Sequence, residues 1–256
     1  MNNLQKLKDI LIKLRSNTGC PWDKEQTHDS LKRNLLEEAY ELLEAIENKD
    51  FENIKEELGD VLLQVFFHSQ IASENQKFDI DDVACGICDK LIRRHPHVFS
   101  DEHIDTAEDV VKRWEEIKKT EKTSSGALSG VILAQSALMA AQQISKKAVK
   151  VGFEWDCYQT LKECFLSELD EFEKEVQKND KNGMEDELGD MFFALVNIAR
   201  WHNIDAEQAL RHANLKFMKR FQMMEKLAQK PLNEYNFKEY DILWKEAKKA
   251  LSKGDF

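Results

Sequence analysis

The sequence predicts an all-α protein made of two related helical-bundle domains in tandem. Apolar residues recur with helical periodicity along most of the chain. Only three prolines and nine glycines interrupt its 256 residues, which leaves room for long helices. A set of four acidic residues occurs twice, 130 positions apart, and no β-hairpin signature stands out. We expect domains at 1–119 and 131–256, joined by the small, polar, glycine-containing linker 120–130.

The first half is predicted to form two antiparallel helices that share a core, followed by two more helices. Apolar stripes and polar breaks predict helices at 31–46, 54–72, 80–94 and 109–119, with an amphipathic helix at 1–15 ahead of them. The helix at 80–94 should end before Pro96, because the residue before a proline disfavours helical geometry.

The second half repeats this order. The predicted helices lie at 133–151, 161–177, 185–201, 206–229 and 240–251. The motif GCPWD at 19–23 corresponds to GFEWD at 152–156. A packed turn and a direct ligand contact explain these tryptophans about equally well, so Trp155 is kept as a candidate substrate contact.

Charge and composition exclude several kinds of partner. The formal net charge is −11, which argues against non-specific binding of nucleic acid through a basic surface. No apolar run approaches the roughly 18 residues of a membrane-spanning helix, and the N-terminus lacks a signal-peptide core. We therefore expect a cytoplasmic protein. Cys85 and Cys88 form a CxxC motif without a second pair for zinc, and we interpret them as small buried residues.

The repeated acids predict two divalent-cation sites. Glu38, Glu41, Glu57 and Asp60 recur as Glu168, Glu171, Glu187 and Asp190. At about 100° per residue, Glu38 and Glu41 flank the apolar stripe centred on Leu35, so packing the two helices should gather four carboxylates at the edge of the core. Acidic residues on helices usually face water, but two copies with equal spacing weaken that interpretation. Carboxylates that repel one another suit Mg²⁺, with Mn²⁺ as a substitute.

Two further features accompany the acids. Gly59 and Gly189 each precede the last acid of a set, and a glycine inside a helix suggests close approach of another helix or of a metal–phosphate group. Two basic pairs follow on the next helix of each half. We call Lys90 with Arg94 the first basic pair, and Lys216 with Arg220 the second basic pair. Their i, i+4 spacing points both side chains the same way, towards phosphate or simply towards solvent.

Segments along nearly the whole chain resemble the MazG family of nucleoside triphosphate pyrophosphohydrolases. The segments are GCPWDKEQTHDSL at 19–31, LEEAYELLEA at 36–45, EELGDVLLQVFFHSQ at 56–70, DKLIRRHPHVF at 89–99 and VGFEW at 151–155. The resemblance implies an all-α bundle that holds Mg²⁺, and a homodimer. It also implies hydrolysis of NTPs or dNTPs at the α–β linkage to monophosphate and pyrophosphate.

The resemblance also implies residue roles. The family pattern EExxE places Glu37, Glu38 and Glu41 in the catalytic group, with Glu168 and Glu171 as second-half counterparts. It places Lys216 and Arg220 where the family binds phosphates, with Asn214 nearby, and Lys90 and Arg94 correspond to them in the first half. The second half departs from the pattern at one position, where Ser167 stands in place of Glu37.

The departure at Ser167 leaves two interpretations open. If Glu37 orients or deprotonates the attacking water, the second half needs another group, and otherwise Ser167 matters little. The resemblance implies that the halves need not be equally active and that the C-terminal half is the more active one. Two alternatives remain for the protein as a whole: a different pyrophosphate substrate on the same fold, or a helical scaffold whose cation sites are structural or regulatory.

Overall fold

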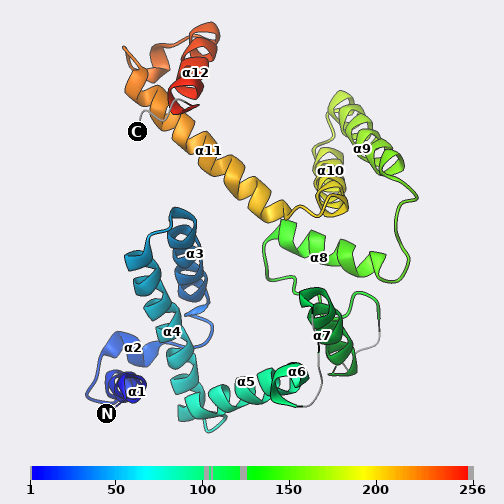
Figure 1. The fold of residues 1–256 in the computed structure, drawn as a ribbon. Coiled ribbons are helices and arrows are strands. Elements are labelled where there is room, and N and C mark those ends of the chain that lie inside the picture. Colours follow the sequence, from blue (N-terminus) through cyan, green and yellow to red (C-terminus); the bar gives the residue numbers. More distant parts are fainter. Residues whose placement is uncertain (1, 101–103, 105, 122–125, 253–256) are drawn as a thin grey trace. The chain divides into compact units, whose positions relative to one another are not determined.

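The computed structural model describes residues 2–100, 104, 106–121 and 126–252, and every regular element among them is helical. This confirms the predicted all-α class (Figure 1). In unit 1 the helices are α1 (Asn3–Arg15), α2 (Pro21–Glu25), α3 (Lys32–Asn48), α4 (Phe51–Glu74), α5 (Ile80–Arg94), α6 (Pro96–Phe99) and α7 (Ala107–Glu121). In unit 2 they are α8 (Ala137–Val149), α9 (Tyr158–Lys178), α10 (Lys181–Trp201), α11 (Ala206–Leu227), the short 3₁₀ helix η1 (Leu232–Glu234) and α12 (Phe237–Ser252).

Contacts within the chain define two compact units, 1–122 and 123–256. The division between them falls inside the segment 120–130, of which residues 122–125 lie outside the described part. Each unit is considered by itself below.

Both units contain a helix hairpin closed by the same tight turn. In unit 1, Lys49 takes a left-handed conformation after α3, and the Asp50 side chain caps α4. In unit 2, Asn179 is left-handed after α9, and the Asp180 side chain caps α10. A left-handed residue ends a helix, and an aspartate accepts hydrogen bonds from the free N–H groups of the next one. These local signals make α3 pack against α4, and α9 against α10.

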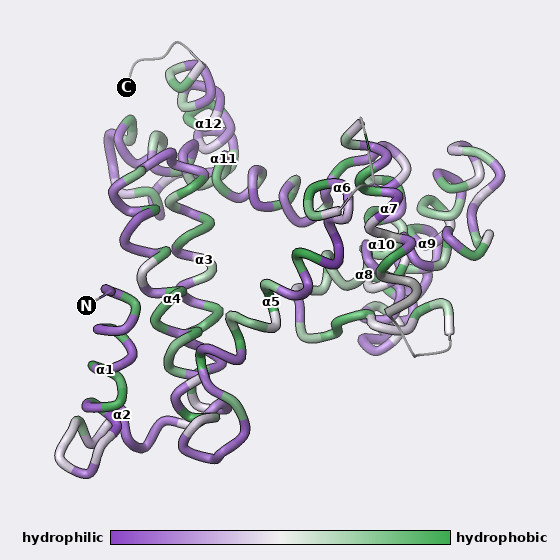
Figure 2. The backbone as a smooth tube through the Cα atoms, turned by 60° about the horizontal axis from the view of Figure 1, so that its bottom comes forward, coloured by the Kyte–Doolittle hydropathy of each residue, from purple (hydrophilic) through white to green (hydrophobic). Residues whose placement is uncertain are grey.

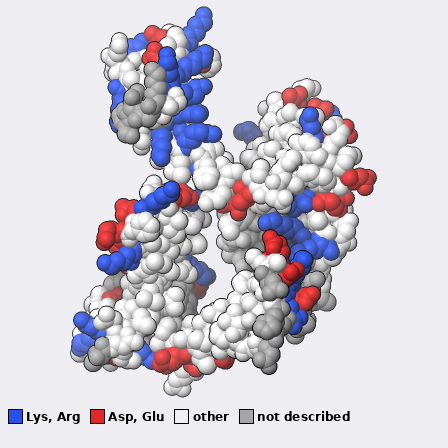
Figure 3. Space-filling view, in the orientation of Figure 1, with Lys and Arg blue, Asp and Glu red and all other residues white. Residues whose placement is uncertain are grey.

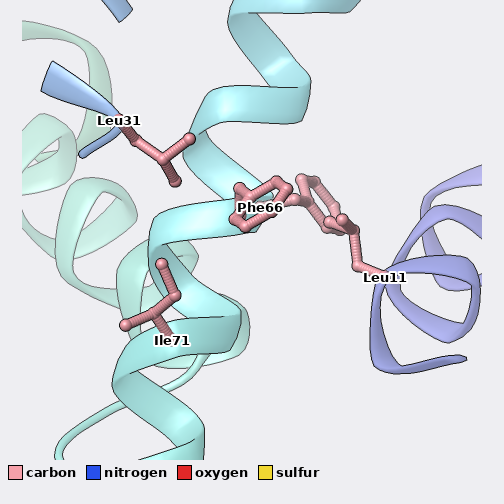
Figure 4. Close-up of a cluster of buried hydrophobic side chains, with 5 residues drawn as sticks. Leu11, Leu31, Phe66 and Ile71 are labelled. Atoms are coloured by element: carbon pink, nitrogen blue, oxygen red, sulfur yellow. The ribbon is translucent and has the colours of Figure 1, made fainter. Parts of the chain in front are cut away.

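The core of unit 1 lies where α1 packs on α4. Leu11 and Leu31 form one buried cluster with Phe66, Phe67 and Ile71 of α4. Figure 4 shows Phe66 between Leu31 and Leu11. The predicted stripe on α3 is less buried than its pattern suggests. Ile46 in that stripe is 50% exposed, and among the described helices of unit 1 the main packing partner of α3 is α4.

Helix α5 matches its predicted limits but not its predicted packing. Residues 81–93 are exposed along their whole length, so Cys85 and Cys88 are exposed rather than buried. The prediction that these cysteines are buried was wrong: Ile80, the first residue of α5, packs against the core of unit 1, whereas the exposed stretch that contains the cysteines does not. The tube in Figure 2 shows hydrophobic and hydrophilic residues alternating along α3 and α4, as amphipathic helices require.

Unit 2 has two packing centres. In the first, α8 packs on α10 beside the α9–α10 hairpin. In the second, α12 folds back on α11 around Met223, Met224, Leu243 and Ala247. Helix α8 begins later than the predicted residue 133, because the Ser136 side chain caps it.

Within the described residues, no helix is both long and apolar enough to span a bilayer.

Candidate active site

The first cluster consists of Glu38 and Glu41 from α3 and Glu57 from α4. One carboxylate oxygen of each lies within 4.8 Å of the others. Glu57 is only 8% exposed, and its Oε2 has no hydrogen-bond partner in the structure. A buried, unpartnered carboxylate oxygen beside two other acids is costly unless a cation binds there. The donor set therefore fits a hard divalent cation such as Mg²⁺.

Burial and like charges act on the protonation of this cluster. Burial raises the pKa of Glu57, and the carboxylates of Glu41, Asp60 and Glu38 raise it further. Burial also raises the pKa of Glu38, helped by Asp60, Glu41 and Glu37. Asp60 thus lies close enough to act on both acids, although it falls outside the group of three. The α3–α4 packing brings three of the four predicted ligands together and places Asp60 beside them.

The second cluster repeats the arrangement with Glu168 and Glu171 from α9 and Glu187 from α10. Their ligand atoms also lie within 4.8 Å of one another. Burial raises the pKa of Glu187, and Glu171, Glu168 and Asp190 raise it further. Asp190, like Asp60, lies outside the group of three acids, but its negative charge helps to raise the pKa of Glu187. The two hairpins have the same turn and the same helix register, and this explains why the clusters match.

The second cluster has two neighbours that the sequence analysis missed. The Cys164 thiol donates to Glu168 Oε1 at 3.7 Å, and Glu175 contributes to the raised pKa of Glu187. Burial and the nearby acids raise the pKa of Cys164. Both residues lie one helical turn from a predicted ligand, so i, i+4 spacing could have found them. The first half has Asn34 at the position of Cys164, so the clusters differ in their surroundings.

The structure shows how the halves differ at Glu37 and Ser167. Arg33 Nε donates to Glu37 Oε1 at 2.7 Å, so this carboxylate is held in an ion pair on α3. Ser167 Oγ donates to Glu171 Oε1 at 3.2 Å. The serine therefore hydrogen-bonds a member of the second cluster, whereas the glutamate adds a negative charge near Glu38.

The basic pairs lie on helices other than the carboxylate hairpins. The first pair is on α5, and the second pair is on α11 with the exposed Asn214. The guanidinium of Arg220 lies over the Trp244 ring of α12, 5.6 Å from its centre. Figure 3 shows Lys and Arg side chains gathered over α11 and α12. The half-buried Trp155 lies between α8 and α9 in the sequence, and its backbone N–H donates to Glu154 Oε1 at 3.0 Å.

An aromatic hollow lies beside Arg220. Its volume is about 300 Å³, and Phe217, Phe221, Phe237, Tyr240 and Trp244 line it, with Asp241 at its side. Faces of aromatic rings provide surfaces on which a nucleobase can stack. Helical periodicity alone assigns such residues to a core, and only the packing of α12 on α11 shows that they enclose a space.

Comparison with known proteins supports a family assignment. The model of the MazG nucleotide pyrophosphohydrolase domain matches residues 26–99 and 157–224. The chain is 44% identical over 249 residues to the nucleoside triphosphate pyrophosphohydrolase/pyrophosphatase MazG of Thermotoga maritima, with 95% of each chain covered. It is 42% identical over 233 residues to the nucleoside triphosphate pyrophosphohydrolase of Escherichia coli K12, with 89% of each covered. The uncharacterized protein YabN of Bacillus subtilis is 45% identical over 249 residues, which are 95% of this chain and 51% of that one. Both matched domains contain a carboxylate cluster, and the chain belongs to the MazG nucleotide pyrophosphohydrolase family.

Proposed function

We propose that this protein hydrolyses nucleoside triphosphates at the α–β linkage, releasing the monophosphate and pyrophosphate with the help of Mg²⁺. The observation that carries the proposal is the pair of matching carboxylate clusters on two equivalent helix hairpins. Family membership and the printed names of the relatives support the reaction class. The cofactor and the bond cleaved are inferred from the donor set and from the resemblance.

The acids would hold the cation in each half. Glu38, Glu41 and Glu57 would bind it in the first half, with Asp60 beside them, and Glu168, Glu171 and Glu187 in the second, with Asp190. When bound, Mg²⁺ neutralises phosphate charge and lowers the pKa of a coordinated water. Ser167 keeps Glu171 oriented by donating a hydrogen bond to it. In the first half, Glu37 is the candidate for orienting the attacking water.

The basic pairs and the aromatic hollow would bind the nucleotide. Lys216 and Arg220 would contact the triphosphate, as would Lys90 and Arg94 in the first half, because guanidinium and ammonium groups stabilise charge on phosphate oxygens. The proximity of Arg220 to Trp244 supports this proposal, because a cationic group then lies beside an aromatic surface on which a base could stack. We assign Asn214 and Trp155 to the same substrate site. Because the aromatic hollow lies beside the second basic pair, we propose that the second half is the more active one.

We also propose a homodimer. Apolar side chains remain exposed on the carboxylate hairpins, among them Leu36, Leu58, Leu166, Leu188 and Phe192. Exposed apolar faces of this extent are typical of association sites, and a hairpin of two helices completes a four-helix bundle by pairing with another hairpin. Light scattering coupled to size exclusion should give twice the chain mass of 29.9 kDa. A single-chain mass would contradict the dimer.

Product analysis tests the reaction. The protein is incubated with each NTP and dNTP, with and without Mg²⁺ or Mn²⁺, and the products are resolved by chromatography. Nucleoside monophosphate and pyrophosphate should appear only with a divalent cation. Diphosphate plus orthophosphate would refute the proposed bond. Ranking a substrate panel by kcat/KM separates ordinary nucleotides from another class of pyrophosphate substrate.

A further inference from the structure

We propose that Gln142 in α8 is a positioning residue for nucleotide binding. It fixes the start of α11 and thereby the location of the second basic pair, Lys216 and Arg220. The proposal rests on the proposed function, in which this pair contacts the triphosphate.

Gln142 joins α8 to the turn between α10 and α11. Its Nε2 donates to the Ile204 carbonyl oxygen at 2.7 Å, and its Oε1 accepts from the Ala206 N–H at 3.0 Å. Gln142 is only 7% exposed, and Ala206, the first residue of α11, is also buried. A side-chain amide carries a donor and an acceptor on one planar group, so it can hold a carbonyl and an N–H at once. The bond to Ala206 is buried and the bond to Ile204 is partly buried, which limits competition from water.

A second contact between α8 and α11 restricts movement of the start of α11. Ser136, which caps the start of α8, donates from Oγ to Glu207 Oε2 at 2.5 Å. Glu207 lies in the first turn of α11. These two attachments, one to backbone and one to a side chain, both hold the first turn of α11 and resist shifting and tilting of the helix at that end.

The basic pair lies far enough along α11 for this direction to matter. Lys216 and Arg220 follow Ala206 by 10 and 14 residues. At about 1.5 Å per residue, they lie roughly 15 and 21 Å from the helix start. Tilting the helix by about 10° would therefore move them by roughly 3 Å. Catalysis is sensitive to displacements of about 1 Å, so an attachment at the start of α11 controls groups well beyond its own contacts.

Unit 1 has an equivalent attachment built from different chemistry. Lys8 in α1 reaches the start of α5, where its Nζ lies 3.3 Å from Asp79 Oδ2 and 2.7 Å from Asp81 Oδ2. Lys90 and Arg94 follow Ile80 by the same 10 and 14 residues. Each unit thus fastens the helix with the basic pair to the helix that precedes its carboxylate hairpin. The first attachment is an ion pair open to solvent and screened by salt, whereas the second is a buried amide.

A double-mutant cycle tests the proposal. Gln142→Leu removes both hydrogen bonds and replaces the amide with an apolar side chain that can still fill most of the buried space. We measure the Kd of a nucleotide with a non-hydrolysable α,β-imido linkage, in the presence of Mg²⁺, by calorimetry on the full-length protein. Gln142→Leu should raise the Kd by on the order of tenfold, a size usual for coupled residues. In a Lys216→Ala, Arg220→Ala background the same substitution should change the Kd by less than about twofold, because the groups that it positions are gone.

Ser145→Ala is the matched control. Ser145 lies three residues further along α8, is buried, and donates from Oγ to Asn197 Oδ1 of α10 at 2.5 Å. This variant removes a buried bond of α8 without touching the start of α11, so it should lower the melting temperature and leave the Kd unchanged.

The outcomes separate the two proposals. If Gln142→Leu leaves the Kd unchanged while the Lys216→Ala, Arg220→Ala variant raises it, the positioning role is refuted. The same holds if Gln142→Leu has its full effect in that background, since its role would then be general stability. If the Lys216→Ala, Arg220→Ala variant itself binds normally, the basic pair is wrongly assigned, and the positioning role fails with it.

Discussion

Arg15 holds Glu74 through two parallel hydrogen bonds, Nε to Oε1 at 2.9 Å and Nη2 to Oε2 at 2.8 Å. Arg15 Nη1 also donates to the carbonyl oxygens of Asp23 and Gln26, and its guanidinium lies over the Phe67 ring. One buried side chain therefore connects α1, the end of α2 and α4. Planar guanidinium groups suit such sites because they donate in several fixed directions.

Arg15→Ala should lower the free energy of unfolding of unit 1 by about 2–3 kcal/mol. The change leaves two carbonyl groups and a carboxylate without their donor, although Glu74 is partly reached by water. Urea unfolding measures the loss. Lys245→Ala, which breaks the exposed pair with Asp241, serves as the control and should cost less than about 1 kcal/mol. If both variants lost the same free energy of unfolding, Arg15 would contribute no more than an exposed ion pair, and the prediction would be contradicted.

The same pair predicts a pH dependence of stability. Hydrogen bonds from Arg15 lower the pKa of Glu74 below its ordinary value of 4.5. The unfolded chain therefore binds the proton more tightly, so this contribution is complete above about pH 4.5 and is lost as the pH falls through the folded pKa. Glu74→Gln should remove this part of the acid destabilisation. Melting temperatures of both proteins between neutral and acid pH measure it, and parallel curves would contradict the assignment.

Neutralising Glu57 should separate cation binding from folding. Without a divalent cation, Glu57→Gln should raise the melting temperature, because it removes a buried charge from among other acids. With Mg²⁺, the wild type should gain stability by mass action, roughly 2.7 kcal/mol at a hundred times the Kd, and the variant should gain less. Glu44→Gln, on the exposed side of α3, is the control and should behave like the wild type. No effect of Mg²⁺ on the wild type would refute the cation site.

Glu171→Gln tests whether the second cluster is catalytic or structural. If it binds the catalytic cation, this variant should lose most hydrolysis of nucleoside triphosphates while its melting temperature stays near that of the wild type, since Glu171 is exposed. Product formation and thermal melting are measured on the same preparation. A wild type without hydrolysis, together with a destabilised Glu171→Gln, would favour the structural or regulatory scaffold.

Gly189→Ala should increase stability by about 1 kcal/mol, because alanine is the better helix former. The two LGD glycines suggest a close approach, but a methyl group at Gly59 or Gly189 would meet nothing within 4 Å in the chain. Close approach of another helix is therefore not seen within either described unit, and the alternative of a metal–phosphate group stays a prediction. Gly19→Ala is the opposite control, since its Cβ would lie 2.1 Å from the Leu14 carbonyl oxygen. Destabilisation by Gly189→Ala would show that a second copy packs there.

Local patterns account for most of the secondary structure. The α5 limits agree with the predicted 80–94, since Asp79 caps its start and Pro96 follows its end. The equal spacing of the acids about the hairpin turns predicts both carboxylate clusters, in each of which three of the four acids lie within 4.8 Å of one another. Caps, prolines and i, i+3 spacing act within a few residues, so they can be read directly from the chain.

The helices, the tandem repeat and the register that gathers the acids all follow from local patterns in the chain. The packing of the helices is needed to show which apolar faces are covered, that α5 leaves Cys85 exposed, and that α12 forms an aromatic hollow with α11. It also brings Arg15 to Glu74 and Gln142 to Ile204 and Ala206, in each case about sixty residues away along the chain. The physical reason is that an amphipathic pattern states that a face prefers to be buried but carries no information about what buries it. Contacts between distant segments depend on how whole helices pack.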